Sequence, residues 1–407
     1  MKRDIFPPLP RQDRCDRILP QKALESKFMP IKVLPPEVAS KIAAGEVVER
    51  PASVVKELVE NSLDAGATEV KVEIFRGGTG LIKVTDNGCG IPPQEVELAF
   101  ARYATSKISS LNDLFRIRTL GFRGEALASI AAVSRVTMIT RPPEEPIGVM
   151  IRVEGGRIVR KEPKGAPAGT TVLVESLFYN VPARRKFLKH PATETAHITE
   201  VVVHYAIAYP EVKFTLFKEG QLSFQSPGSG EMRDVLARVY GPEVAGALLE
   251  LEATEGPLKL HGYIGPPSLH RAQRAHTFFV NRRWVQDAML GKALLEAYHG
   301  FLPSGRYPVA VISLEIDPSL VDVNVHPTKR EVRFRNPDEV FQAFQKAVRR
   351  LILSTQSSFA VSPRPVSPVE SGAEQRPFPI SQPKPPAPPE PALPLTRTLP
   401  LLRVLGQ

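Results

Sequence analysis

Acidic and amide side chains recur at helical spacing in residues 56–66, whose sequence is KELVENSLDAG. With about 3.6 residues per turn, a helix places four of them on one face: Glu57, Glu60, Asn61 and Asp64. Such a face can hold a general base one turn away from an amide oxygen that ligates a metal ion. The same spacing is also typical of a solvated helix face, so this segment alone leaves both interpretations open.

Two glycine-containing motifs follow that helix along the chain. Residues 86–91 (DNGCGI) come after a strand-like run at 81–84, and residues 121–127 (GFRGEAL) begin a further helix. Asp-Asn-Gly by itself indicates a turn, and a two-glycine loop before a helix is a weak phosphate-binding signature. The order of all three motifs within about 70 residues is what predicts a nucleotide-binding site.

In this order, the motifs resemble those of the GHKL ATPase superfamily, which includes gyrase, heat-shock chaperones, histidine kinases and MutL. The resemblance is much closer to the MutL family of DNA mismatch-repair proteins than to the other members, and it extends from about residue 29 to about residue 350. Besides the first helix, five segments carry it: IAAGEVVERPAS at 42–53, ATSKI at 104–108, GFRGEAL at 121–127, LFYNVPARRKFL at 177–188 and VDVNVHPTK at 321–329.

The resemblance implies an α/β (α+β) fold, in which a Bergerat-type GHKL ATPase sandwich is followed by a smaller transducer domain that resembles ribosomal protein S5. Alternating helix and strand patterns place the ATPase domain at 29–228. The turn-forming sequence PGSG marks its end, and an amphipathic pattern at 338–353 closes a transducer domain at 229–353.

Three segments lie outside these domains. Residues 1–28 are rich in Arg, Lys and Pro and are predicted to be a disordered extension. Residues 354–400 hold 13 of the 41 prolines, which favours an extended linker. Residues 401–407 resemble the start of a MutL C-terminal domain, so we expect the dimerisation domain to be lacking. No His or Asp follows residue 353 to ligate a metal, so no endonuclease activity is expected either.

The composition favours a polyanionic partner. The 407-residue chain carries a formal net charge of +10 at pH 7, and basic residues concentrate at 157–164, 184–189, 271–283 and 329–335. Few aromatic residues interleave with them, so we expect DNA to be bound through its phosphates with little dependence on sequence. Two cysteines and the lack of any long apolar run indicate a reducing compartment, expected to be the cytoplasm, and no membrane segment.

The resemblance assigns the hydrolytic chemistry to the first helix. Glu57 would orient and deprotonate the attacking water, because a carboxylate is ionised at pH 7 and accepts a hydrogen bond from water. Asn61, one turn later, would ligate Mg²⁺ through its amide oxygen. Glu60 and Asp64 are at least as consistent with salt bridges or helix solvation as with a role in catalysis.

The other ATP contacts are implied in the same way. Asp86 would accept a hydrogen bond from the adenine amine, and Thr170 would share this network, although a strand-start threonine is an equally good interpretation of Thr170. Gly88 and Gly90 would let the backbone approach the base. The phosphates would be met by a lid, by N–H groups at a helix start and by a lysine of the second domain: Thr105, Ser106, Lys107, Gly121, Phe122, Arg123, Gly124 and Lys329.

A DNA contact is expected at Arg283, which matches a DNA-contacting arginine of the family. It ends a turn, 280–283, that carries Arg282 where the family has glycine. A turn without that glycine can bend differently.

Together these features predict a mismatch-repair ATPase in which ATP binding closes a dimer clamp and hydrolysis reopens it. The implied partners are DNA, the mismatch sensor MutS, downstream nuclease or helicase factors, and a second copy of the chain when nucleotide is bound. An ATPase fragment of a type II topoisomerase is the alternative, although the cleavage domain with its catalytic tyrosine is missing. A sensor kinase would need a phosphoacceptor histidine on a dimerising helix, and no such segment precedes residue 29.

Overall fold

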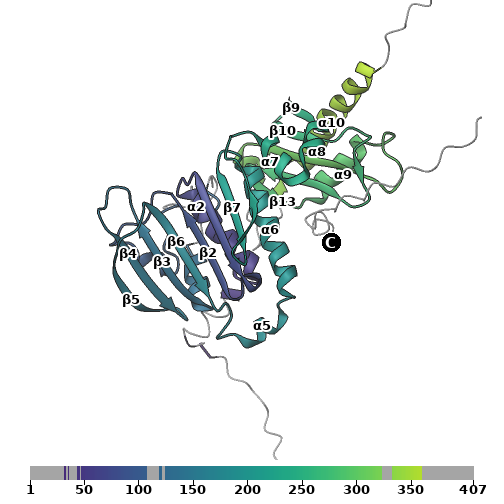
Figure 1. The fold of residues 1–407 in the computed structure, drawn as a ribbon. Coiled ribbons are helices and arrows are strands. Elements are labelled where there is room, and N and C mark those ends of the chain that lie inside the picture. Colours follow the sequence, from purple (N-terminus) through teal and green to yellow (C-terminus); the bar gives the residue numbers. More distant parts are fainter. Residues whose placement is uncertain are drawn as a thin grey trace, which may run out of the picture.

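The computed structural model describes residues 32–33, 35, 44–45, 47–107, 119–121, 124–322 and 332–359. Within these ranges the chain forms two large β-sheets, each with helices packed on it (Figure 1). Some predictions lie outside the described residues: the extension at 1–28, nearly all of the segment after 353, and the site residues Phe122, Arg123 and Lys329.

The first sheet has eight strands in the order β5-β4-β3-β6-β2-β1-β7-β8, and only β1 and β7 pair in parallel. Along the chain the strands are β1 (Glu69–Phe75), β2 (Leu81–Asp86), β3 (Arg135–Arg141), β4 (Gly148–Glu154), β5 (Arg157–Lys164), β6 (Gly169–Glu175), β7 (Lys213–Lys218) and β8 (Gln221–Gln225). Helices α2 (Pro51–Asp64), α4 (Ala126–Ala132) and α6 (Pro191–Ala208) pack on this sheet, and the short α5 (Pro182–Phe187) precedes α6. This helix-on-sheet sandwich confirms the predicted fold class.

Helix α2 begins at a proline, which suits the first helical position, and buries an apolar stripe that includes Val55, Leu58 and Val59. It ends where the positive φ of Gly66 turns the chain back toward β1. The polar residues of α2 do not all share one environment, because Glu60 is buried at 1% exposure whereas the other three face a cavity.

The second sheet contains β9 (Leu249–Glu255), β10 (Leu258–Ile264), β11 (His270–Arg271), β12 (Ala275–Val280), β13 (Arg283–Val285) and β14 (Tyr307–Glu315). Their order is β13-β12-β14-β10-β9, with β11 paired to β14. The chain adds α7 (Met232–Tyr240), α8 (Pro242–Ala247), α9 (Ala288–Ala297), a short β15 (Val321–Asp322) paired with β16 (Arg333–Phe334), and α10 (Pro337–Phe359). Helix α10 packs on α9 and β9 and completes a second core.

The two sheets are joined by continuous packing. Helix α6 contacts β13 (Figure 1). The ring of His204 stacks on Trp284, with the ring centroids 3.8 Å apart. Buried residues of α7 and α8, such as Val235 and Ala245, belong to the first core although they follow the expected boundary at 228/229. That boundary therefore stays a prediction. No helix within the described ranges is long and apolar enough to cross a membrane.

The turn between β12 and β13 keeps a tight geometry despite its sequence. Val280 pairs with Arg283 across a two-residue connection, and both connecting residues, Asn281 and Arg282, have positive φ, at 49° and 64°. Two-residue hairpins of type I′ require positive φ at both positions, which suits glycine. Arg282 therefore adopts a backbone conformation that favours glycine, and the turn is a tight two-residue hairpin without one.

Candidate nucleotide-binding site

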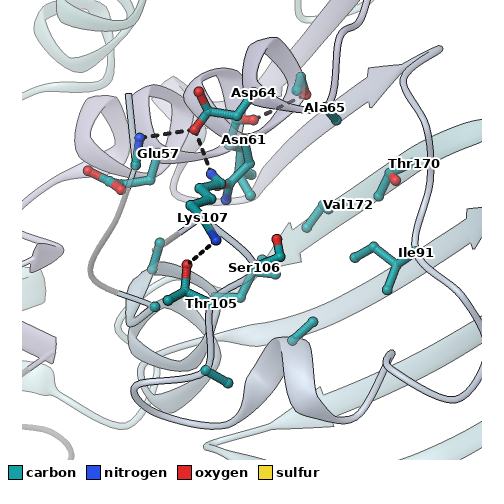
Figure 2. A pocket seen from close by; sticks show the side chains of 18 of the residues that line it. Glu57, Asn61, Asp64, Ala65, Ile91, Thr105, Ser106, Lys107, Thr170 and Val172 are labelled. Atoms are coloured by element: carbon teal, nitrogen blue, oxygen red, sulfur yellow. Dashed lines mark hydrogen bonds and ion pairs between the residues drawn. The ribbon is translucent and has the colours of Figure 1, made fainter. Parts of the chain in front are cut away.

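A cavity of about 970 Å³ lies between α2, the first sheet and the segments around residues 103–107 and 119–127. Its volume suits a nucleotide-sized ligand. Ten of the predicted site residues line it: Glu57, Asn61, Asp86, Gly90, Thr105, Ser106, Lys107, Gly121, Gly124 and Thr170. Figure 2 shows the polar end, where Asn61 and Asp64 project from α2 towards Lys107 and Glu57 lies beside them, and the opposite wall with Thr170 and Ile91.

Strand register brings the polar residues of the sheet into one row. Asp86 on β2 pairs with Thr170 on β6, which in turn pairs with Thr140 on β3. The hydroxyl oxygens of Thr170 and Thr140 lie 3.0 Å apart, and Thr140 accepts a hydrogen bond from the backbone N–H of Ile91 at 2.9 Å. Thr140 is buried and was missed from the sequence, because the pairing that places it joins strands far apart in the chain.

Apolar residues form the adjacent row of the sheet. Val84 pairs with Val172, which pairs with Met138, and all three line the cavity. Each lies two residues from a polar partner on the same strand and so shares that partner's face: Val84 precedes Asp86, Met138 precedes Thr140, and Val172 follows Thr170. The two-residue period was the available signal for these side chains. The row gives a flat base an apolar surface beside the carboxylate.

Asp86 is held by three hydrogen bonds from protein donors. Its Oδ2 accepts from the hydroxyl of Ser62 at 2.8 Å, and its Oδ1 accepts from the N–H groups of Gly88 at 2.9 Å and Thr170 at 3.1 Å. Burial raises the pKa of Asp86, although these hydrogen bonds oppose the shift. A carboxylate can accept about four hydrogen bonds, so Asp86 can take a further donor such as an amine. The sequence did not single out Ser62.

The two glycines of the 86–91 motif have a packing role in this structure. Gly88 does not line the cavity, and a Cβ there would lie 2.8 Å from the Cβ of Ala65. Gly90 has a φ of 68°, and a Cβ there would lie 2.6 Å from the backbone carbonyl carbon of Arg141. Both positions require glycine because the loop packs tightly on α2 and β3, and the approach of a base to the backbone there stays a prediction.

At the polar end, Lys107 joins two residues of α2. Its ammonium group lies 2.9 Å from Asn61 Oδ1 and 2.6 Å from Asp64 Oδ2 (Figure 2). Asp64 also accepts hydrogen bonds from the backbone N–H groups of Leu120 at 2.9 Å and Gly121 at 3.0 Å. Asp64 therefore forms a salt bridge, as one interpretation of the sequence allowed, but this salt bridge lies inside the cavity. The Asp64 carboxylate also accepts hydrogen bonds from two backbone N–H groups of the kind that bind anions.

The lid residues also contact the 121–124 segment. A Cβ on Gly124 would lie 2.6 Å from the carbonyl oxygen of Ala104, and a Cβ on Gly121 would lie 3.1 Å from the ammonium nitrogen of Lys107. Thr105 Oγ1 accepts from the N–H of Lys107 at 3.1 Å, which shapes the lid turn. Gly124 is therefore needed for the close approach of the two segments, whereas the atom nearest to Gly121 is the end of a flexible side chain.

Glu57 faces the cavity while Glu60 is directed into the protein. Lys56 lies between the two carboxylates, with its ammonium 3.5 Å from Glu57 and 2.8 Å from Glu60. Burial lowers the pKa of Lys56, but the charges of Glu60 and Glu57 outweigh it and raise that pKa overall. Tyr205 donates its hydroxyl proton to Glu60 at 2.6 Å, and burial followed by this neighbouring charge raises the Tyr205 pKa strongly. Glu60 is thus a structural carboxylate.

The side chain of Arg283, which was predicted to contact DNA, is buried. Its side chain begins β13 and is only 7% exposed, with Nη2 donating to the backbone carbonyl of Thr119 at 3.1 Å. A phosphate contact needs a guanidinium that solvent-borne DNA can reach. The DNA contact at Arg283 stays a prediction without an exposed guanidinium to support it, because the hairpin turn directs Arg283 inward and leaves its neighbour Arg282 exposed.

Two family models match the chain. Residues 49–156 match a family described as histidine kinase-, DNA gyrase B- and HSP90-like ATPase, and residues 236–353 match one described as DNA mismatch repair protein, C-terminal domain. The first covers α2 and much of the first sheet, which contribute most of the cavity. The second covers the second sheet.

Curated relatives share the name DNA mismatch repair protein MutL. The protein from Halothermothrix orenii is 48% identical over 319 residues, which is 78% of this chain and 50% of that protein. The one from Symbiobacterium thermophilum is 50% identical over 324 residues, which is 79% of this chain and 51% of that protein. This chain thus spans about half the length of the curated relatives that it matches.

Solved structures agree with this assignment. The Aquifex aeolicus MutL ATPase domain complexed with ADP is 36% identical, with a TM-score of 0.53, over 67% of this chain and 94% of that one. A crystal structure described as the N-terminal domain of a DNA repair protein is 27% identical, with a TM-score of 0.69, over 79% of this chain and 99% of that one. The chain therefore has the fold of a GHKL ATPase.

Proposed function

This chain belongs to the MutL family of DNA mismatch-repair proteins, and on that premise we propose that its cavity binds ATP with Mg²⁺ and hydrolyses the nucleotide slowly. The observation that carries the proposal is the placement of Glu57 and Asn61 one helical turn apart on the wall of the cavity that contains Asp86. The site thus holds a base, a neutral oxygen ligand and an adenine acceptor together.

The adenine end is proposed to lie against the sheet. Asp86 would accept a hydrogen bond from the exocyclic amine, and the buried row of Val84, Val172 and Met138 would contact the face of the base. The hydrogen bond between the hydroxyls of Thr140 and Thr170 would hold Thr170, whose N–H donates to the Asp86 carboxylate, in place. A guanine offers a carbonyl oxygen at the amine position, so Asp86 would disfavour GTP.

The phosphate end is proposed to lie at the Lys107 side of the cavity. The backbone N–H groups of Leu120 and Gly121 already hold an anionic group, the Asp64 carboxylate, so a phosphate oxygen could replace it there. Asn61 Oδ1 likewise faces a cation, the Lys107 ammonium, which fits a site for Mg²⁺. Mg²⁺ would supply charge neutralisation on the phosphates when it is bound.

Glu57 is the proposed general base. Its carboxylate lines the cavity, and Lys56 lies beside it without closing it off, since Lys56 forms its shorter ion pair with Glu60. Glu57 could therefore accept a proton from a water molecule positioned against the terminal phosphate. Lys329 keeps the γ-phosphate contact implied by the family, and Phe122 and Arg123 keep the implied backbone N–H contacts to the phosphates.

The wider role proposed is that of a mismatch-repair clamp. Nucleotide binding would order the lid and favour a dimer of two copies, and MutS and downstream nuclease or helicase factors would be the partners. DNA would be bound through phosphates by exposed basic side chains such as those of β5, which is exposed along nearly its whole length. The relatives that match most of this chain are MutL proteins, so a topoisomerase fragment is not favoured.

Replacement of Glu57 with Ala tests the central assignment. Turnover of ATP should fall by about 10²–10⁴-fold, as expected for the loss of a general base, while ATP affinity measured by calorimetry changes little. Asn61→Ala is the companion variant, and it should lose Mg²⁺-dependent nucleotide affinity instead. Wild-type turnover in Glu57→Ala would remove Glu57 from the mechanism.

A further inference from the structure

Arg283 makes a contact from the second sheet to the wall of the nucleotide cavity. Its Nη2 donates to the carbonyl oxygens of Thr119 at 3.1 Å and Leu120 at 3.4 Å. Thr119 and Gly121, on either side of Leu120, line the cavity. The Nη1 atom of Arg283 is buried, and it has no hydrogen-bond partner among the residues that the structure describes.

The same two peptide groups are bound on their opposite side by Asp64. A peptide group consists of the carbonyl of one residue and the N–H of the next, so the Thr119 carbonyl belongs with the Leu120 N–H and the Leu120 carbonyl with the Gly121 N–H. Asp64 accepts from both of these N–H groups, at 2.9 and 3.0 Å. Each peptide plane is therefore held between a guanidinium and a carboxylate.

This arrangement affects how strongly the N–H groups can bind an anion. A cation on a peptide carbonyl polarises the group and makes its N–H a stronger donor, and it also fixes the orientation of the plane. Burial of a guanidinium is costly for folding unless its nitrogens are paired, and the two carbonyl contacts of Nη2 offset part of that cost.

We propose that Arg283 is a positioning residue for the phosphate subsite, through which the second sheet holds the 119–121 peptide in its anion-binding orientation. This inference rests on the proposed function, since it takes the phosphates to bind at the Leu120 and Gly121 N–H groups. It gives the second sheet a direct influence on nucleotide affinity.

The neighbouring arginine supplies a matched control. Arg282 has the same side chain one position earlier, but its side chain is 53% exposed, forms an ion pair with Glu211 and lies over the ring of Tyr209 at 5.0 Å. It does not line the cavity. Substitution at Arg282 removes a positive charge from the same turn without touching the 119–121 peptide.

The test compares Arg283→Met, Arg283→Lys and Arg282→Met in the full chain. Calorimetry should show affinity for a non-hydrolysable ATP analogue reduced about tenfold in Arg283→Met, as expected for the loss of one charge-assisted contact. Arg283→Lys should recover part of the lost affinity, because lysine keeps the positive charge but lacks the planar fork of donors of a guanidinium. Arg282→Met should bind the analogue like the wild type. DNA binding without nucleotide should be unchanged in Arg283→Met.

A second readout needs no nucleotide. Amide hydrogen exchange at Leu120 and Gly121 should be faster in Arg283→Met than in the wild type and unchanged in Arg282→Met. Equal exchange, equal analogue affinity, or the same loss in both arginine variants would overturn the proposal. Failure of the wild type itself to bind the analogue would instead refute the proposed function. If amide exchange at Leu120 and Gly121 were still faster in Arg283→Met, Arg283 would hold the 119–121 peptide without a role in nucleotide binding.

If Arg283→Met does not fold, the Lys variant and a double-mutant cycle with Asp64→Asn carry the test. Because Asp64 and Arg283 hold the same two peptide groups, their effects on amide exchange should be non-additive. Additive effects would overturn the proposal.

Discussion

Glu60→Gln should lower the free energy of unfolding by about 3 kcal/mol, because it removes one charge from a buried ion pair and keeps the shape of the side chain. Glu60 is 1% exposed, pairs with Lys56 at 2.8 Å and accepts the Tyr205 hydroxyl proton at 2.6 Å. Breaking a buried pair costs about 3–5 kcal/mol. Lys56 keeps a second carboxylate, Glu57, at 3.5 Å, so we expect the lower end of that range.

Thermal unfolding measures this loss directly. In domains of this size about 1 kcal/mol shifts the midpoint by about 2–4 °C, so Glu60→Gln should lower it by about 6–12 °C. Glu73→Gln is the matched control, since Glu73 also pairs with two lysines, Lys71 at 2.6 Å and Lys83 at 3.3 Å. Those lysine side chains are 47% and 32% exposed, so the control should cost no more than about 1 kcal/mol.

The same substitution should also affect turnover. With Glu60 neutral, Lys56 is expected to shift towards Glu57 and compete for the carboxylate that would receive the proton from water. The turnover rate should then fall while affinity for a non-hydrolysable analogue stays close to that of the wild type. Equal midpoints for Glu60→Gln and Glu73→Gln would refute the reasoning, because burial would then not decide the strength of the pair.

Three further predictions concern the cavity and the dimer. Gly66→Ala and Gly90→Ala place a Cβ at similar positive φ, 72° and 68°, but only the Cβ at residue 90 meets other atoms. Gly66→Ala should therefore lower the free energy of unfolding, measured with denaturant, by about 1–2 kcal/mol, and Gly90→Ala should lower it clearly more and abolish nucleotide binding. Equal losses of stability would show that φ strain alone matters. Burial raises the pKa of Asp86, so on acidification nucleotide affinity should begin to fall at a pH above about 3.9, the pKa of an exposed aspartate. The contribution of Asp86 to folding stability should rise as the pH falls through its folded-state pKa, because the folded state binds the proton more tightly. Affinity that does not change with pH by calorimetry would contradict the acceptor role. Sedimentation should give a monomer without nucleotide or with ADP and a dimer with a non-hydrolysable ATP analogue, and the same mass in all three states at concentrations up to about tens of micromolar would defeat the clamp model.

The helical part of the site could be predicted because its signal is local. Glu57 and Asn61 are four residues apart, and an apolar stripe at helical spacing directs the same face of α2 away from the core, so both line the cavity. Glu60 followed the same pattern and is nonetheless buried, because its environment depends on Tyr205 of α6. That contact joins residues 145 positions apart, and no local period contains it.

The sheet part of the site could be predicted only in part, because register is not a local property. Asp86 was found from a turn motif and Thr170 from the family resemblance, but Thr140 and the apolar row depend on which strands become neighbours. Strand β6 lies between β2 and β3 although it follows both in the chain. The acceptor, its hydroxyl partners and the apolar surface for the base therefore meet only after a long-range pairing forms.

The two arginines of the β12–β13 turn show how one backbone conformation separates functions that the sequence places side by side. Positive φ at Asn281 and Arg282 makes the hairpin tight, so Arg282 lies at the tip in solvent and Arg283 begins a strand whose side chain enters the seam between the two sheets. A sequence pattern rich in basic residues cannot distinguish these two environments, since both residues carry the same charge. DNA phosphates can therefore be reached by exposed basic groups such as Arg282 and those of β5, while the proposed role of Arg283 is to hold the peptide groups of the nucleotide cavity.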